Sequence, residues 1–152
     1  MIFDRTQSDV EASKALINEK VKTFAEITFA EEEILERGTM TIKTLNRIEE
    51  KQAELQVIFK AMGYYNLNIE NETWYYPNFF TADDFQRILE NTNALRDAFF
   101  EYIGTPATPL ISYYYEDVNA LEKILHDLDQ MAASIKANYK RCGTFRCGRK
   151  SI

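Results

Sequence analysis

Three segments of the chain place apolar residues at alternating intervals of three and four. The resulting seams are Leu45, Ile48, Gln52, Leu55, Phe59 and Met62; Phe85, Ile88, Thr92, Leu95, Phe99 and Tyr102; and Val118, Leu121, Leu125, Leu128, Ala132, Ile135 and Tyr139. This heptad spacing is typical of helices that pack along one another. Further apolar residues beside the seams, among them Ile58, Leu89 and Ile124, widen them toward the packing of a globular bundle.

Capping signals mark where the helices begin and end. A threonine followed three residues later by an acid, the capping box, occurs at Thr6, Thr28 and Thr81. Glycines that can close a last helical turn follow three periodic segments, at Gly38, Gly63 and Gly104. Together these signals predict helices over residues 7–25, 29–37, 42–62, 82–102 and 116–139.

The sequence therefore predicts an all-α fold. Three long helices form a helical bundle with coiled-coil-like packing, and shorter helices precede them. In this interpretation residues 1–139 are one helical domain, and residues 140–152 are a basic, cysteine-containing C-terminal tail. Both connections between the long helices are long enough to return along a helix, so parallel and antiparallel arrangements stay open.

Two seam positions are polar, Gln52 and Thr92. A polar residue in a seam lowers stability and commonly fixes the helix register or the number of associating helices. This structural role is favoured over a buried functional site. We expect the two side chains to lie near one another or at an interface between copies of the chain.

A weak internal repeat links the three segments. LNRIEEKQAEL from Leu45 and FQRILENTNAL from Phe85 place Arg47 and Arg87 at equivalent positions, and VNALEKILHDL from Val118 is a looser third copy. Duplication of a helix and convergence on the heptad pattern would both produce this match. Its shortness favours convergence.

The two long connections are rich in aromatic residues. YYNLNIENETWYYPNFF follows Gly63, and TPATPLISYYYE follows Gly104. Tyrosine and tryptophan bring a large contact area at low entropic cost, so these residues either cap the end of the bundle or contact a partner. Stacking on the sugar rings of a glycan is a minor alternative. The predicted interaction residues are Trp74, Tyr75, Tyr76, Tyr113, Tyr114 and Tyr115.

The two cysteines, Cys142 and Cys147, lie close together in RCGTFRCGRK. They are interpreted as free thiols or a local disulfide, with cross-linking between chains as an alternative. Zinc is disfavoured, because a structural zinc ion requires four ligands and the single histidine, His126, lies beside a helix seam. Short β-hairpins are compatible with this tail, where a glycine follows each cysteine, and with the alternating segment NLNIENETWYY.

The charge distribution disfavours nucleic acid as a partner. The net charge is −6, but residues 140–152 carry +5 and the remainder carries −11. An acidic body repels phosphate backbones and anionic membranes. The sequence has no signal-peptide pattern and no apolar run long enough to span a membrane, so we expect synthesis in a cytosol.

No catalytic signature is recognisable in the sequence. The histidine lacks a neighbouring nucleophile, a glycine-rich phosphate loop is missing, and paired acids such as Asp83 and Asp84 suit a helix N-terminus. The Glu-x-x-His pairs of di-iron bundles are missing too. We therefore expect no enzymatic activity, no cofactor and no metal.

An ordered set of segments resembles a known group of proteins. DRTQSDV, LNRIE, TADDFQRILENTNALRDAF, TPATP, VNALEKILHDL and CGTFRCG follow one another between Asp4 and Gly148. In this order they resemble small helical proteins encoded in the tail-structure regions of phages and prophages of Firmicutes. That group has no catalytic residues to transfer to this chain. The resemblance implies a virion protein of the tail or baseplate.

The resemblance and the heptad seams together lead to a functional hypothesis. We expect a structural or interaction protein of a phage or prophage tail, associated with the baseplate or a fibre. It is synthesised in the bacterial cytoplasm and located in the virion tail. Its seams and aromatic loops pack against copies of itself, as a homo-oligomer, and against neighbouring tail proteins. The alternative is a host-facing module that binds a glycan or a protein, or an adaptor or regulator outside the virion.

Overall fold

The computed structural model describes residues 1–23, 25–77, 79–98 and 114–142, with the side chains of the last range described through Asn138. Within these residues the chain forms five helices and no strand. The helices are α1 (Gln7–Thr23), α2 (Phe29–Gly38), α3 (Ile42–Ala61), α4 (Ala82–Asp97) and α5 (Tyr115–Cys142). The predicted all-α class and helical-bundle packing are confirmed.

The helix boundaries follow the capping signals. The capping boxes at Thr28 and Thr81 close as predicted, and Gly63 takes a positive φ of 105° after α3. α5 continues past the predicted end at residue 139 to Cys142. The division into three long helices and shorter N-terminal ones is not confirmed, because α1 has 17 residues and α4 has 16.

Gly38 is the exception among the predicted stop signals. It is the last residue of α2 and does not follow the helix as a left-handed cap. A Cβ atom at this position would lie 1.9 Å from Ser13 Oγ and 2.2 Å from Asp9 O, and Ser13 Oγ donates a hydrogen bond to Ile34 O (2.6 Å). The glycine is therefore needed for the close approach of α1 and α2, which we call the arm.

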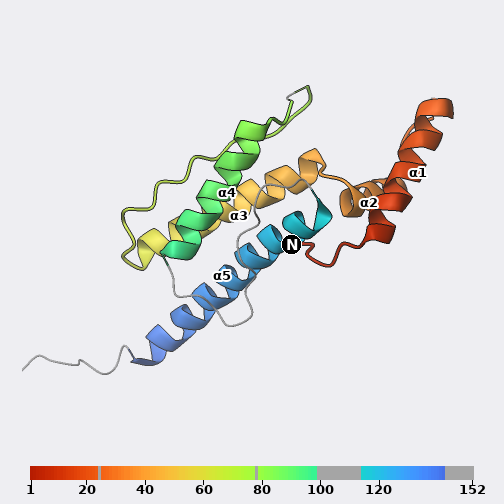
Figure 1. Cartoon of the computed structure of the whole chain (residues 1–152). Coiled ribbons are helices and arrows are strands. Elements are labelled where there is room, and N and C mark those ends of the chain that lie inside the picture. Colours follow the sequence, from red (N-terminus) through yellow and green to blue (C-terminus); the bar gives the residue numbers. More distant parts are fainter. Residues whose placement is uncertain (24, 78, 99–113, 143–152) are drawn as a thin grey trace, which may run out of the picture.

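The helices α3, α4 and α5 lie side by side and run in the same direction (Figure 1). We call these three helices the bundle. When two helices are parallel, a contact further along one helix also lies further along the other. This holds for Glu49–Arg87 and Gln52–Thr92 between α3 and α4, and for Arg47–Glu122 and Lys51–Asp129 between α3 and α5. The helix direction that the sequence left open is therefore parallel.

The core of the bundle is built from the predicted seams. Its buried seam residues are Leu45, Ile48, Gln52, Leu55, Phe59, Phe85, Ile88, Thr92, Leu95, Val118, Leu121, Leu125, Leu128 and Ala132. Met62 is half-buried and Ile135 is exposed, while the side chains of Phe99, Tyr102 and Tyr139 lie outside the described residues. A single chain thus supplies all three sides of this core.

The residues between α3 and α4 return along the bundle as an extended layer (Figure 1). The predicted β-hairpin in residues 66–76 is not supported, since no strand is found there. Leu67 and Ile69 are buried against the core, which accounts for the alternation in the sequence. Side chains of α3 and α4 satisfy the backbone of this layer: Gln56 donates to Leu67 O, Asn91 to Glu70 O, and Asn46 to Trp74 O. A second strand is therefore not required.

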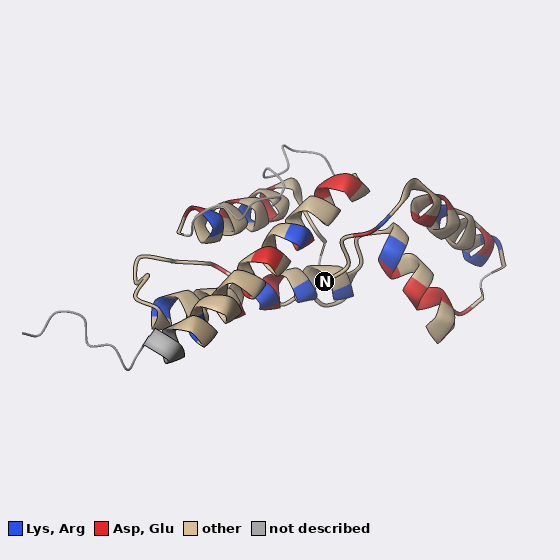
Figure 2. Ribbon diagram, turned by 90° about the horizontal axis from the view of Figure 1, so that it is seen from below, with Lys and Arg blue, Asp and Glu red and all other residues tan. Residues whose placement is uncertain are grey.

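The arm projects from one end of the bundle, and the last turns of α5 extend from the other (Figures 1 and 2). Ser13 is the single buried residue of α1, and α2 has none. The arm therefore holds its two helices together without a hydrophobic core of its own.

Breaking a buried ion pair should weaken the bundle strongly. Arg87 binds Glu49, whose side chain is 2% exposed. We expect Arg87→Ala to lower the free energy of unfolding by about 3 kcal/mol, because the carboxylate is left buried without its charged partner. Urea denaturation followed by circular dichroism measures this loss. Lys22→Ala, on the exposed side of α1, is the control and should change it by less than about 0.5 kcal/mol. An equal effect of the two variants would contradict the structural role of the pair.

Candidate functional site

The Glu49 carboxylate is the most densely bonded group of the bundle. Arg87 donates to both of its oxygens, at 2.7 and 3.1 Å. Asn71 Nδ2 and the backbone N–H of Glu72 donate to Oε2, at 3.0 and 3.3 Å, and Trp74 Nε1 donates to Oε1 at 3.3 Å. All these bonds are made to a carboxylate that is almost completely buried. The group therefore joins α3, α4 and their connection.

The electrostatics of this cluster stabilise the charge of Arg87. The hydrogen bond to Glu49 raises the pKa of Arg87 above its ordinary value, and burial lowers it by a smaller amount. A carboxylate that already accepts from four residues has little capacity left for a substrate or a proton transfer. The arrangement can hold helices in place, and it offers no open reactive group.

A second buried carboxylate, Glu122, joins α5 to the rest of the chain. Arg47 Nε donates to its Oε1 (2.8 Å), and Arg5 Nη1 (2.5 Å) and the N–H of Ile2 (3.2 Å) donate to Oε2. Arg47 also pairs with Glu36 of α2. Nη2 of each arginine is buried without a hydrogen-bond partner among the described residues, so this cluster is less completely satisfied than the one at Glu49.

The two ion pairs occupy matching places in the weak sequence repeat. Arg47 and Arg87 are third in their copies, while Glu49 and Glu122 are fifth in theirs. Each arginine binds the glutamate of a neighbouring helix: α4 to α3, and α3 to α5. The remaining third and fifth positions hold Ala120 and Leu89, so the interface of α4 and α5 has no corresponding charge pair. At both interfaces, the third position of one copy therefore pairs with the fifth position of the copy on the neighbouring helix, so the helices pack in the same register.

The polar seam residues meet inside the bundle. Gln52 Nε2 donates to Thr92 Oγ1 and to Ile88 O, both at 2.8 Å, and Asn91 Nδ2 donates to Gln52 Oε1 at 3.3 Å. Gln52 and Thr92 are fully buried. Their predicted proximity is confirmed; their role in fixing the register stays a prediction.

The predicted aromatic residues divide into a buried and an exposed group. Trp74 is 4% exposed, packs edge-on against Phe80 at 5.4 Å between ring centroids, and binds Glu49. It belongs to the core. Of the two alternatives for this residue, packing on the bundle and contact with a partner, the first is observed, and its N–H has the buried acceptor that it requires. Tyr75 and Tyr76 are exposed, the latter by 89%.

Of the three tyrosines predicted before the last helix, the structure describes two. Tyr114 is exposed, Tyr115 begins α5 and is half-buried, and Tyr113 lies outside the described residues. The candidate disulfide also lies outside them, since neither the Cys142 side chain nor Cys147 is described. The expected turn around these cysteines is equally untested.

Phe79 is an exposed aromatic residue that the predicted interaction set omitted, and so are Tyr64 and Tyr65 of the same connection. It is 87% exposed and follows Tyr75 and Tyr76 in the same connection. The segment was recognisable as aromatic, but which side chains face inward depends on the long-range contacts of Trp74 and Phe80 with the bundle. We call Tyr75, Tyr76 and Phe79 the aromatic surface.

A second apolar surface lies around the connection of the arm. Val21, Ile27 and Phe29 are all exposed there, Phe29 by 88%. No apolar residue of either arm helix is buried. Large apolar side chains left exposed are candidates for contact with another molecule. We call these three residues the arm tip.

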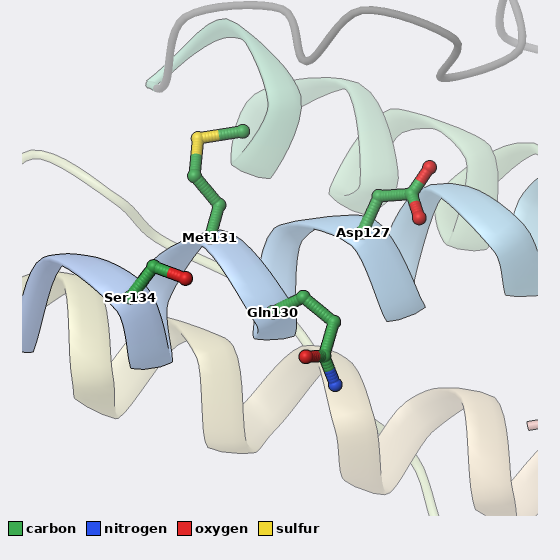
Figure 3. A pocket seen from close by; sticks show the side chains of 4 residues that line it. All are labelled: Asp127, Gln130, Met131 and Ser134. Atoms are coloured by element: carbon green, nitrogen blue, oxygen red, sulfur yellow. The ribbon is translucent and has the colours of Figure 1, made fainter. Parts of the chain in front are cut away.

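A shallow hollow of about 290 Å³ lies on α5, lined by Asp127, Gln130, Met131 and Ser134. These side chains come from one helix and point in different directions (Figure 3). Asp127 is already paired with Lys123. Among the residues that the structure describes, the lining of this hollow offers no convergent set of polar groups of the kind that orients a small ligand.

In the part of the chain that the structure describes, no three potential metal-ligating side chains lie together. None of the described helices combines the length and the apolar character needed to cross a bilayer. Comparisons with protein-family models, with curated proteins and with solved structures found no match. The resemblance to phage tail proteins therefore stays a prediction.

An ion pair between Lys20 of α1 and Glu31 of α2 joins the two helices of the arm. Lys20 Nζ lies 2.7 Å from Glu31 Oε2, and Thr28 donates to the same oxygen. The bonds from Lys20 first, and from Thr28 second, lower the pKa of Glu31 from 4.5 to about 2. A lowered carboxyl pKa stabilises the folded arm above pH 4.5, and this contribution is lost as the pH falls toward 2.

We expect carbon NMR of the Glu31 carboxyl to give a pKa of about 2, and Lys20→Met to raise it toward 4.5. Lys22→Met, on the same helix, is the matched control and should leave the value low. A pKa near 4.5 in the unaltered protein would contradict the contact between α1 and α2 at this place.

Proposed function

We propose that the chain is a structural and interaction protein of a phage or prophage tail, associated with the baseplate or a fibre. The observation that carries this proposal is the exposure of two separate apolar surfaces, the arm tip and the aromatic surface, on a chain whose described seam residues are mostly buried. The ordered sequence resemblance supplies the virion setting. The neighbouring molecules are tail proteins and further copies of the chain.

The bundle acts in this proposal as a rigid spacer. Its three parallel helices pack like a coiled coil within one chain, with Gln52 and Thr92 fixing the register. Because a single chain fills the seams, contacts with neighbours are assigned to the exposed surfaces and not to the seams. From the heptad pattern alone, the contacts with neighbours would be expected along the seams.

The buried acids support a structural role and not a catalytic one. Glu49 and Glu122 are each bonded to arginine side chains and backbone amides of the same chain. Groups used in this way hold helices together. No enzymatic activity, cofactor or metal is proposed.

An alternative function is a host-facing module that binds a glycan or a protein, or an adaptor outside the virion. The near-complete exposure of Tyr76 and Phe79 favours this alternative, since exposed rings can stack on sugars or fill a pocket of a protein. The two functions differ in whether the chain is a constituent of the particle.

Mass spectrometry of purified tail particles tests the setting. We expect the chain in a fixed ratio to the other tail proteins. A complete particle that lacks the chain would contradict the virion assignment and favour the adaptor.

Exchange of the aromatic surface tests the contact itself. We expect Tyr76→Ser with Phe79→Ser to lower incorporation into particles at least about tenfold, because exposed aromatic anchors commonly contribute about 2 kcal/mol each to an interface. Val57→Ser removes another exposed apolar side chain, on α3, and should leave incorporation unchanged. Equal incorporation of both variants would contradict a role for the aromatic surface.

A further inference from the structure

The first five residues of the chain are bound to one face of α5. Figure 1 shows the N-terminus beside this helix, although 114 positions in the sequence separate Arg5 from its partner Asn119. Residues 1–3 are half-buried, and Arg5 is buried, with an exposed fraction of 5%. We call residues 1–5 the latch.

α5 binds the latch through its backbone and through its arginine. Asn119 Oδ1 accepts a hydrogen bond from the N–H of Arg5 (3.1 Å), and Asn119 Nδ2 donates to Arg5 O (2.8 Å). Arg5 Nη1 donates to Glu122 Oε2 at 2.5 Å, and the N–H of Ile2 donates to the same oxygen. The amide thus binds both backbone groups of one residue, and the carboxylate next to it binds the side chain of that residue. This arrangement suits a peptide that carries an arginine.

The Phe3 ring contacts two further side chains of α5. Its centroid lies 5.1 Å from that of His126 and 5.6 Å from Lys123 Nζ, and a cation near the face of an aromatic ring is attracted to it. Asn119, Glu122, Lys123 and His126 are three or four positions apart, so they share one side of the helix. We call these four residues the latch site. It fits an aromatic residue two positions before an arginine.

The latch can leave without stranding a buried charge. Arg47 Nε donates to Glu122 Oε1 at 2.8 Å, so the carboxylate keeps a charged partner when Arg5 is removed. A buried carboxylate without any partner is the state that costs most, and here it does not arise. Arg5 is also the one buried residue of the latch. Segments that bury few apolar side chains are among the first to open.

The latch is one of the attachments that hold the arm beside the bundle. Ion pairs between α2 and α3 form another, Glu36–Arg47 and Glu32–Lys43, and all four of these side chains are partly exposed. Partly exposed pairs of this kind hold weakly. The connection between the two helices is residues 39–41, and its first and last residues are extended. Without the latch, the arm would therefore be joined to the bundle by a short extended segment and by weak pairs.

We propose that the latch is a releasable ligand of α5, and that its binding fixes the direction of the arm. The partner that releases it is a protein segment with an aromatic residue two positions before an arginine. Such a segment competes for the latch site, and its binding frees the arm to turn about residues 39–41. The inference goes beyond the proposed function, and its failure would leave the tail assignment untouched.

The synthetic peptide MIFDRTQ, amidated at its C-terminus, tests whether the site accepts the latch as a separate molecule. NMR of the isotope-labelled protein measures its affinity. We expect the peptide to bind the Arg5→Ala variant of the protein at least about tenfold more tightly than the unaltered chain, because a tethered latch competes at an effective concentration of about 1 mM. Asn119→Ala, added to this variant, should lower the affinity for the peptide. The same peptide with Arg5→Ala is the matched control and should not bind.

Spin labels measure the direction of the arm. They are attached through Val21→Cys on α1 and Val57→Cys on α3, two exposed positions, in a protein whose own cysteines are replaced by serine. We expect a narrow distribution of distances in this protein, and a wider one when Arg5→Ala is added or when the peptide is in excess. Lys14→Ala removes an exposed basic residue of α1 and should leave the distribution narrow.

Three results would overturn the proposal. Equal affinity of the peptide for the unaltered chain and for the Arg5→Ala variant would place its binding away from the latch site. A variant that keeps its helix content by circular dichroism and does not bind the peptide would mean that the latch is not a separable ligand. An unchanged distance distribution in this variant would mean that the arm is held without the latch.

A second variant covers the case in which Arg5→Ala loses helix content. Phe3→Ser removes the ring from the latch and leaves the ion pair with Glu122 in place. We expect it to bind the peptide more tightly than the unaltered chain and to widen the distance distribution. The same three results would overturn the proposal for this variant.

Discussion

The fold depends on the need to pair two buried carboxylates. Glu49 and Glu122 are both removed from water, and each would cost several kcal/mol if left without a positively charged partner. Their partners are Arg87 on α4 and Arg47 on α3. Taken with the contacts Gln52–Thr92 and Lys51–Asp129 further along the same helices, these pairs hold the helices in one direction and one register. The apolar seams supply the driving force for packing, but they alone would tolerate other registers.

The same pairs connect the bundle to the segments around it. Glu49 also fixes Trp74 and the extended layer between α3 and α4, and Glu122 fixes the N-terminal residues through Arg5. Arg47 links this second cluster to Glu36 of the arm. Because the arm has no apolar core, its place beside the bundle rests largely on such polar contacts.

Local sequence signals were sufficient to predict the helices. The heptad positions placed Leu45, Ile88 and Leu121 in the core, and the capping boxes at Thr28 and Thr81 gave two helix starts. These predictions succeeded because seams and caps depend on residues a few positions apart.

What failed depended on contacts between distant residues. The alternation around Leu67 and Ile69 suggested a hairpin, yet side chains of α3 and α4 satisfy that backbone. For Trp74 the sequence left packing on the bundle and contact with a partner open, because its buried acceptor, Glu49, is revealed by no local pattern. The buried ion pairs and the contact of Gln52 with Thr92 all belong to a bundle whose helices run in the same direction.

Distances between pairs of spin labels measure this direction, in a protein whose cysteines are replaced by serine. One pair joins Val57 of α3 to Ala94 of α4, and the other joins Val57 to Gln86, which lies about 12 Å from Ala94 along the helix. All three positions are exposed, so the labels should not disturb the core. The parallel bundle predicts that the pair with Ala94 gives the shorter distance. A shorter distance for the pair with Gln86 would contradict the parallel arrangement and everything derived from it.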